Sequence, residues 1–166
     1  MSKEEHQQAP PPAPSAPGIF DPARLYHVAI CVHSVAETAH FYEEKFGIGP
    51  FWFRDVDYPT ATFHGEVAGY RGRRGFAQLG PLLLELVEPV AGRTIHEPFL
   101  KEKGEGLHHL GFEVDNLSEA IAEAEQRGFR MTQTFRRPDG SGFAYFDSDT
   151  IGGTVFEIVE KPRQKG

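Results

Sequence analysis

The stretch HLGFEVDNLSEAIAEAEQR, residues 109–127, repeats an earlier stretch of the chain without a gap. The earlier copy is HVAICVHSVAETAHFYEEK, residues 27–45, so that His27 aligns with His109. Each copy begins with an alternating apolar run, passes a polar turn and continues with apolar residues at helical spacing. The sequence therefore predicts the same unit, a strand followed by a helix, twice in one chain.

Residues typical of helix ends flank the helical part of each copy. Ser34 and Asn116 precede it and are suitable N-cap residues, and a glutamate follows each of them three positions later, as in a capping box. Gly47 and Gly128 follow the helical part, where a glycine commonly ends a helix. We therefore expect one helix in each copy between these residues.

The two halves also close alike, with LELVEP at residues 84–89 and FEIVEKP at residues 156–162. Further β-prone runs lie between helix and closing strand, so each half has the pattern βαβββ. A sheet with a helix on one face needs a partner for the other face, and two such sheets can curl into one incomplete barrel. We expect an α+β domain at residues 21–162, with module 1 at about 24–90, module 2 at about 106–161, a cup inside and the helices outside.

Alternation along the strands selects the residues that face the cup. Successive side chains point to opposite faces of a strand, so the adjacent histidines His108 and His109 separate. His109 shares its face with Gly111 and polar neighbours, as a pocket wall would, whereas His108 shares its face with Leu110 and other apolar residues. We expect His109 to face the cup and His108 to face the opposite side.

The same rule gives four candidate metal ligands. His27 has small residues as its same-face neighbours on the first strand, and Glu85 and Glu157 have apolar ones on the closing strands. Buried carboxylates cost several kcal/mol each and repel one another, and a divalent cation offsets both costs. The alternative is two structural histidines and two solvated glutamates, but the match between repeats favours one metal site of His27, Glu85, His109 and Glu157. These ligands do not distinguish Co, Ni, Zn, Mn, Mg and Fe.

Composition excludes other classes of site and partner. A single cysteine, Cys31, leaves no intrachain disulfide and no Cys-rich zinc site, and we expect it to be a small buried neighbour of His27 rather than a nucleophile. A formal net charge of -7 argues against a nucleic-acid partner. No apolar run is long enough to span a membrane, and residues 1–20 are a proline-rich tail expected to be disordered, without a secretory signal. We expect a cytoplasmic protein.

The repeat and the four ligand positions resemble the vicinal oxygen chelate superfamily, which includes glyoxalase I, methylmalonyl-CoA epimerase, extradiol dioxygenases and the fosfomycin and bleomycin resistance proteins. The resemblance covers about residues 24–161, and GEGLHHLGFEVDNL and LGPLLLELVEP are most similar to the epimerase and glyoxalase-like members. It implies a metal-dependent isomerase, epimerase or lyase that moves a proton next to a chelated carbonyl. Our first choice is an epimerase of an acyl-CoA similar to methylmalonyl-CoA, and we also expect a homodimer.

The resemblance also implies catalytic roles. Glu157 corresponds to the ligand that can act as the base in glyoxalase I, and Glu85 resembles the glyoxalase I arrangement, because the epimerase carries Gln there. The epimerase uses a further glutamate on the middle strands of the first half, and here only Asp55, Asp57 and Glu66 are candidates for it. A glyoxalase I-type lactoylglutathione lyase, an extradiol-type dioxygenase and a non-catalytic binding or resistance protein stay as alternatives. The complete ligand set favours an enzyme.

The run YRGRRG, residues 70–75, concentrates positive charge in an acidic chain. Arg71, Arg73 and Arg74 could bind a CoA phosphate or a substrate carboxylate, since guanidinium groups pair with such oxygens. A charged, mobile hairpin tip explains the same run equally well. The aromatic residues 51–53 lie where the rim of the cup is expected, and we favour a core or dimer contact over a stacking surface.

Overall fold

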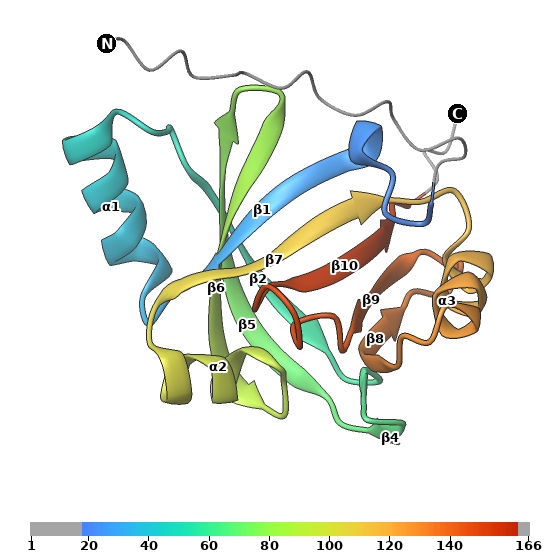
Figure 1. The fold of residues 1–166 in the computed structure, drawn as a ribbon. Coiled ribbons are helices and arrows are strands. Elements are labelled where there is room, and N and C mark those ends of the chain that lie inside the picture. The colour runs from blue at the N-terminus through green and yellow to red at the C-terminus, as the bar shows by residue number, and fades with distance from the viewer. Residues whose placement is uncertain (1–17, 163–166) are drawn as a thin grey trace, which may run out of the picture.

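The computed structural model of the protein describes residues 18–162. One mixed sheet of ten strands dominates these residues and curls into a half-barrel (Figure 1). Its strand order is β2-β5-β6-β1-β7-β10-β9-β8-β3-β4. The strands are β1 (Leu25–Cys31), β2 (Trp52–Tyr58), β3 (Thr62–Phe63), β4 (Glu66–Val67), β5 (Tyr70–Leu79), β6 (Leu82–Gly92), β7 (Gly106–Glu113), β8 (Met131–Arg136), β9 (Gly142–Phe146) and β10 (Val155–Glu160).

The four strands that carry the predicted ligands are neighbours in the middle of this sheet. β1 runs parallel to β6 and antiparallel to β7, and β7 runs parallel to β10. The first and last strands of each half therefore stand side by side, and the first strands join the two halves. The prediction of an α+β fold with two βαβββ modules in one incomplete barrel is confirmed.

The helices α1 (Val35–Phe46) and α3 (Leu117–Gln126) pack against the convex face of the sheet, one on each half (Figure 1). Their N-caps are those expected: the Ser34 hydroxyl accepts a hydrogen bond from the backbone of Glu37, and the Asn116 side chain accepts two. Helix α1 ends at Gly47, whose φ of 67° lies in the left-handed region that glycine adopts readily. The expected helix positions are confirmed.

Helix α2 (His96–Lys103) connects the halves and lies at the end of the half-barrel (Figure 1). Its Leu100 packs against Ala29, Cys31 and Val87. These residues follow the predicted ligands on the same faces of β1 and β6, so α2 closes the cup at that end.

One element was not expected from the repeat. Between β2 and β5 the chain forms the short hairpin of β3 and β4, and β3 pairs with β8 of the other half. Aromatic residues near this connection pack across the two halves, with the rings of Tyr58 and Phe135 centred 4.5 Å apart. The concave face is therefore partly filled by side chains of both modules.

Two residues just before position 21 also pack onto the domain. Ile19 is buried and Phe20 packs edge-on against Phe112 and Phe156, so both residues belong to the core around α3. Residues 1–17, the main part of the predicted tail, lie outside the described residues. Within residues 18–162, no helix combines the length and apolar character needed to cross a membrane.

Candidate metal centre

Two imidazoles and two carboxylates converge on the concave face of the sheet. The His27 Nε2 atom lies 2.9 Å from Glu157 Oε2 and 3.2 Å from Glu85 Oε2. The His109 Nε2 atom lies 3.3 Å and 3.5 Å from the same two oxygens, and 3.1 Å from His27 Nε2. The structure thus brings the four predicted ligands to one point from β1, β6, β7 and β10.

Glycine at position 111 makes room for this cluster. Gly111 pairs with His27 across the β1–β7 ladder, and a Cβ atom at that position would collide with the His27 ring. Any other residue here would push the imidazole away from the carboxylates. The absence of a side chain at Gly111, on the same face as His109, therefore leaves the space that the His27 ring occupies.

The spacing of these atoms fits a bound divalent ion. An ion about 2.1 Å from each ligand holds neighbouring ligand atoms roughly 3 to 3.4 Å apart, close to the separations of 2.9 to 3.5 Å found here. The Glu157 Oε2 atom is also buried, and although both Nε2 atoms lie near it, neither meets hydrogen-bond geometry. The ligand atoms of His27, Glu85 and His109 all lie within 4.8 Å of one another, as a metal group requires. Glu157 adjoins this group through its contacts with the two histidines.

The electrostatics of the cluster keep both carboxylates charged. Burial by itself would raise the pKa of Glu157, but its contacts with His109 and His27 lower it below its ordinary value. The pKa of Glu85 is lowered against burial by the same two histidines. Burial would lower the pKa of His109, yet Glu157 and Glu85 raise it to about 9. A divalent cation can therefore take the place of the histidine proton between two ionised carboxylates.

The prediction that His108 faces away from the cup was wrong. A bulge in β7 shifts the register so that Ala29 pairs with His109 and Ile30 with Leu107, which leaves His108 as the extra residue. A bulge places two successive side chains on one side of a strand. His108 is consequently buried beside His109, with their Nδ1 atoms 2.8 Å apart.

The three arginines are divided between the two faces of β5, which is a regular strand and not a hairpin tip. Arg74 points into the cup, is 4% exposed, and its Nε atom lies 3.2 Å from Glu85 Oε1. Gly72 leaves the space for its guanidinium group, because a Cβ atom there would lie 2.6 Å from Nη1. Arg71 is exposed on the opposite face, where Arg73 pairs with Asp55.

The three candidates for a further base also lie outside the cup. Asp55 pairs with Arg73 on the outer face of β5, and Asp57 is exposed on the same face of β2. Glu66 is exposed and pairs with Arg93. Apart from Glu85 and Glu157, the cup-facing residues of the described first-half strands and of β10 include no carboxylate.

Sequence reasoning missed the aromatic residues of the cup. Tyr145 pairs with Glu157 across the β9–β10 ladder, and its ring centre lies 5.1 Å from that of His109. On β5, Tyr70 and Phe76 are an even number of residues from Arg74, so all three side chains face the cup. The alternation rule could have shown this pattern from the sequence. Burial raises the pKa of Tyr145 and Tyr70 well above the ordinary range, so both stay neutral phenols.

Cys31 is buried on the cup face of β1 beneath α2, as expected for a structural residue. Burial raises the pKa of its thiol to about 12 from 9.0. Because alkylation needs the thiolate, the native protein should react with iodoacetamide at pH 8 roughly a thousandfold more slowly than the denatured chain. Mass spectrometry of timed samples measures this ratio, and equal rates would contradict the buried position.

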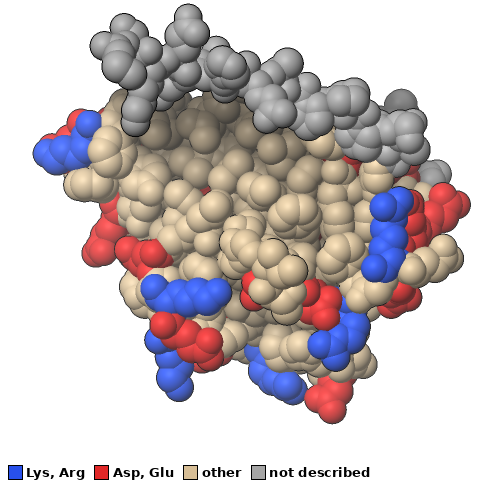
Figure 2. All heavy atoms as spheres, viewed as in Figure 1, with Lys and Arg blue, Asp and Glu red and all other residues tan. Residues whose placement is uncertain are grey.

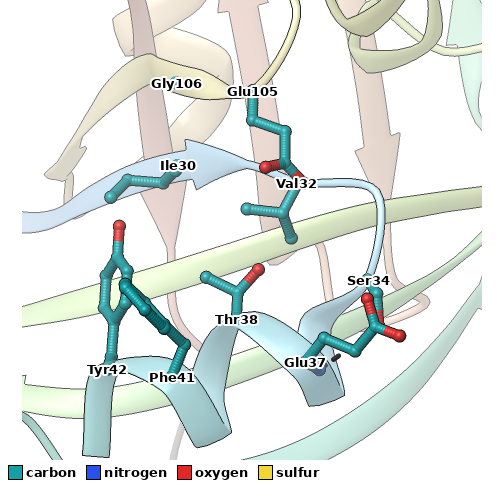
Figure 3. Close-up of a pocket in the computed structure, with 9 residues that line it drawn as sticks. All are labelled: Ile30, Val32, Ser34, Glu37, Thr38, Phe41, Tyr42, Glu105 and Gly106. Atoms are coloured by element: carbon teal, nitrogen blue, oxygen red, sulfur yellow. Dashed lines mark hydrogen bonds between the residues drawn. The ribbon is translucent and has the colours of Figure 1, made fainter. Parts of the chain in front are cut away.

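A separate hollow of about 400 Å³ lies on the other side of the sheet, between α1 and the strands β1 and β7. Figure 3 shows Thr38 and Tyr42 of α1 pointing toward Val32 and Ile30. No histidine lines it, so it offers no site comparable to the four-ligand cluster. On the face shown in Figure 2, the visible central area consists mainly of uncharged residues, and charged side chains gather along the sides and lower edge.

Most of the chain matches a known family. A family model described as the glyoxalase/bleomycin resistance protein/dioxygenase superfamily matches residues 26–146. The mitochondrial methylmalonyl-CoA epimerase of Homo sapiens is 30% identical over 145 residues, covering 86% of this chain and 76% of that protein. The uncharacterised protein YqjC of Bacillus subtilis is 29% identical over 140 residues, covering 82% of this chain and 91% of that protein.

Solved structures share the fold. A methylmalonyl-CoA epimerase of Streptomyces coelicolor in complex with 2-nitronate-propionyl-CoA has a TM-score of 0.64 and 21% identity, covering 84% of this chain and 98% of its own. A hypothetical protein of Bacillus halodurans has a TM-score of 0.65 and 24% identity, covering 86% of this chain and 96% of its own. At these identities, the similarity shows a common architecture.

Proposed function

Because the chain belongs to the glyoxalase/bleomycin resistance protein/dioxygenase superfamily, we propose that it is a divalent-metal-dependent enzyme that moves a proton on the carbon next to a carbonyl. The substrate class we propose is an acyl-CoA thioester similar to methylmalonyl-CoA, and the reaction is its epimerisation. The relatives that bear the name methylmalonyl-CoA epimerase support this choice.

The observation that carries the proposal is the four-ligand cluster beside a buried arginine. Two neutral imidazoles, two carboxylates and a divalent ion have no net charge, and Arg74 adds one positive charge. Among the described residues, the carboxylate that pairs with Arg74 is Glu85. The charge of Glu85 is already counted in the cluster, so it does not balance the charge of Arg74. The loaded cup therefore carries one unbalanced positive charge, which suits a substrate with one carboxylate near the reacting carbon.

The residues of the cup supply the proton transfer. His27, Glu85, His109 and Glu157 would hold the metal ion, which would supply Lewis acidity for negative charge on the carbonyl oxygen. The Glu157 carboxylate takes the proton from the α-carbon, the C–H bond breaks, and its electron pair shifts toward the carbonyl oxygen. Glu85 lies on β6, across the β1–β7 pair from β10. After taking up a proton from solvent, Glu85 would donate it to the other face of the carbon, and Glu157 would release the abstracted proton to solvent. Tyr145 and the aromatic residues around it exclude water.

A hollow at the mouth of the cup supports a long substrate. It has a volume of about 390 Å³ and is lined by Tyr26, Arg54 and Leu83 together with the stacked rings of Trp52 and Phe76. Phe76, which lines the hollow, pairs with Glu85 in the β5–β6 ladder, so the hollow lies next to the strand position of one candidate ligand. The extended part of a CoA thioester lies here in the proposed complex.

The test is deuterium exchange by the metal-loaded protein. One epimer of methylmalonyl-CoA is incubated in D₂O, and proton NMR follows the α-proton while chiral analysis follows the other epimer. The proposal expects exchange and epimer formation that both disappear when a chelator removes the metal. An exchange rate no higher than that of the free ion with the same thioester would contradict the proposed function.

Arg74 is proposed to bind the substrate carboxylate, and its removal gives a prediction of its own. Arg74→Met should lower kcat/KM for methylmalonyl-CoA by roughly tenfold to hundredfold, because a charge-assisted pair is worth about 1.5–3 kcal/mol. Exchange on 2-methylacetoacetyl-CoA, which has an acidic α-carbon but no carboxylate, should change little. The matched comparison is Arg73→Met, on the opposite face of the same strand. Equal losses for both thioesters would show that Arg74 serves Glu85 and not the substrate.

A second candidate, a lyase of the glyoxalase I type, is favoured by one specific observation. Glu85 occupies the ligand position on β6, and Asp55, Asp57 and Glu66 all lie outside the cup. A lyase of this type would move the proton with a single carboxylate on one face of the substrate, so it would need no further base. Formation of a thioester from a thiohemiacetal, without epimerisation of methylmalonyl-CoA, would select this candidate.

A further inference from the structure

A chain of buried polar groups leads from His109 away from the cup. After the 2.8 Å contact between the Nδ1 atoms of His109 and His108, the ring of His96 lies 4.6 Å from that of His108, centre to centre. The His96 Nδ1 atom is 2.8 Å from the Thr94 hydroxyl, which donates to Gln133 Oε1 at 3.2 Å. All five side chains are buried.

Gln133, at the far end of these buried side chains, fixes the direction of the hydrogen bonds. The backbone N–H of Ile95 points at the same Gln133 atom at 3.1 Å, so this atom is the amide oxygen and only accepts. The Thr94 hydroxyl must then donate to Gln133, and its oxygen must accept from His96 Nδ1. His96 therefore carries its proton on Nδ1, and its buried Nε2 lone pair has no partner among the described residues.

The near end is fixed by the candidate metal centre. His109 directs Nε2 at Glu85, Glu157 and His27, so a metal held there needs the Nε2 lone pair and leaves the proton on Nδ1. That proton points at His108 Nδ1, which must accept it. The His108 ring is 1% exposed, and its Nδ1 atom lies within hydrogen-bond distance of the His109 Nδ1 atom.

We infer that His108 is a positioning residue for the metal: its Nδ1 atom accepts the Nδ1 proton of His109 and holds that ring with Nε2 directed into the cup. The Gln133–Thr94–His96 chain packs against His108 and limits its rotation. Histidine ligands generally give their second N–H to such an acceptor, and removing the acceptor weakens metal binding tenfold to hundredfold. Here the acceptor is a neighbouring histidine, which the β7 bulge brings to the same side of the strand.

The nitrogen atoms of His96, His108 and His109 also lie within 4.8 Å of one another, close enough to be considered as a metal group themselves. Hydrogen bonds already occupy the Nδ1 atoms of all three rings in the arrangement derived above. The group also contains no carboxylate to balance a cation, unlike the cluster in the cup. We therefore assign these histidines to support of the first site rather than to a second one.

The inference rests on the proposed metal site, and its test is cobalt(II) binding, measured by competition with a coloured chelator. His108→Leu removes the acceptor and should weaken binding tenfold to hundredfold, whereas His108→Asn keeps an oxygen near the Nδ1 position and should stay within about threefold. Phe99→Leu is the control, because Phe99 packs on the His108 ring without contacting His109 through a hydrogen bond. Equal affinities of the Leu and Asn variants would overturn the inference.

The wild-type protein gives an independent test that needs no variant. Nitrogen-15 NMR of the zinc-loaded, histidine-labelled protein should show a proton on Nδ1 of His109 and none on Nδ1 of His108. The reverse assignment, or two metal ions per chain, would overturn the positioning role. If His109→Ala still binds metal, the metal site itself fails. If that variant loses metal while His108→Leu keeps full affinity, only the present inference fails.

Discussion

Replacing His109 with Ala is expected to remove stoichiometric divalent metal from the protein. The change takes away one of four ligands and leaves Glu85 and Glu157 charged and close together. If each ligand contributes about a quarter of the ~10–16 kcal/mol of a complete site, the loss of about 3 kcal/mol weakens binding more than a hundredfold. Elemental analysis after dialysis against a weak chelator measures the metal that remains.

The control for this result is His40→Ala. His40 lies on α1 with a side chain that is 78% exposed, far in the fold from the cup face of the sheet. The control should keep the same metal content as the wild type. Equal metal content in the His109 and His40 variants would show that the cup is not the metal site.

Replacing Glu157 with Gln should cause a large loss of activity in a protein that still binds the metal. A Gln side chain keeps a carbonyl oxygen near the Oε2 position but cannot accept the substrate proton. Since general-base catalysis contributes roughly 10²- to 10⁴-fold, kcat should fall by that factor while the metal affinity falls about tenfold at most. Steady-state exchange kinetics at saturating metal separate the two effects.

A matched control lies three positions further along β10. Glu160 accepts a hydrogen bond from the backbone of Leu117 at the start of α3, and a Gln there keeps that acceptor. Glu160→Gln should therefore leave kcat unchanged. If Glu157→Gln retains activity within a few-fold, the proton moves through another group, and Glu85 becomes the first to examine.

The parts of this fold that the sequence predicts are those governed by regular periodicity. The alternation along β1 and β6 places His27 and Glu85 on one face, and the repeat transfers the same positions to His109 and Glu157. Ser34 and Asn116 predict their helix starts because a side-chain oxygen can accept from free N–H groups there. Each of these inferences depends only on residues a few positions apart.

The parts that the sequence does not predict depend on register between distant strands. Whether His108 is paired or bulged is decided by its alignment with β1, about 80 residues away, and no residue type in β7 marks the bulge. Alternation already places Arg73 and Arg74 on opposite faces of β5, but which of them faces the cup depends on the pairing of β5 with β6. The supporting residues Thr94 and Gln133 are ordinary polar residues until the fold buries them together.

The central claim, one metal ion held by His27, Glu85, His109 and Glu157, is tested most directly by crystallography with cobalt(II). An anomalous difference map recorded above the cobalt edge should show one peak on the concave face of the sheet. The account predicts that this peak lies about 2.0–2.2 Å from both Nε2 atoms and from one oxygen of each carboxylate. A peak among His96 and His108, or no peak within reach of the four side chains in protein saturated with cobalt, would contradict it.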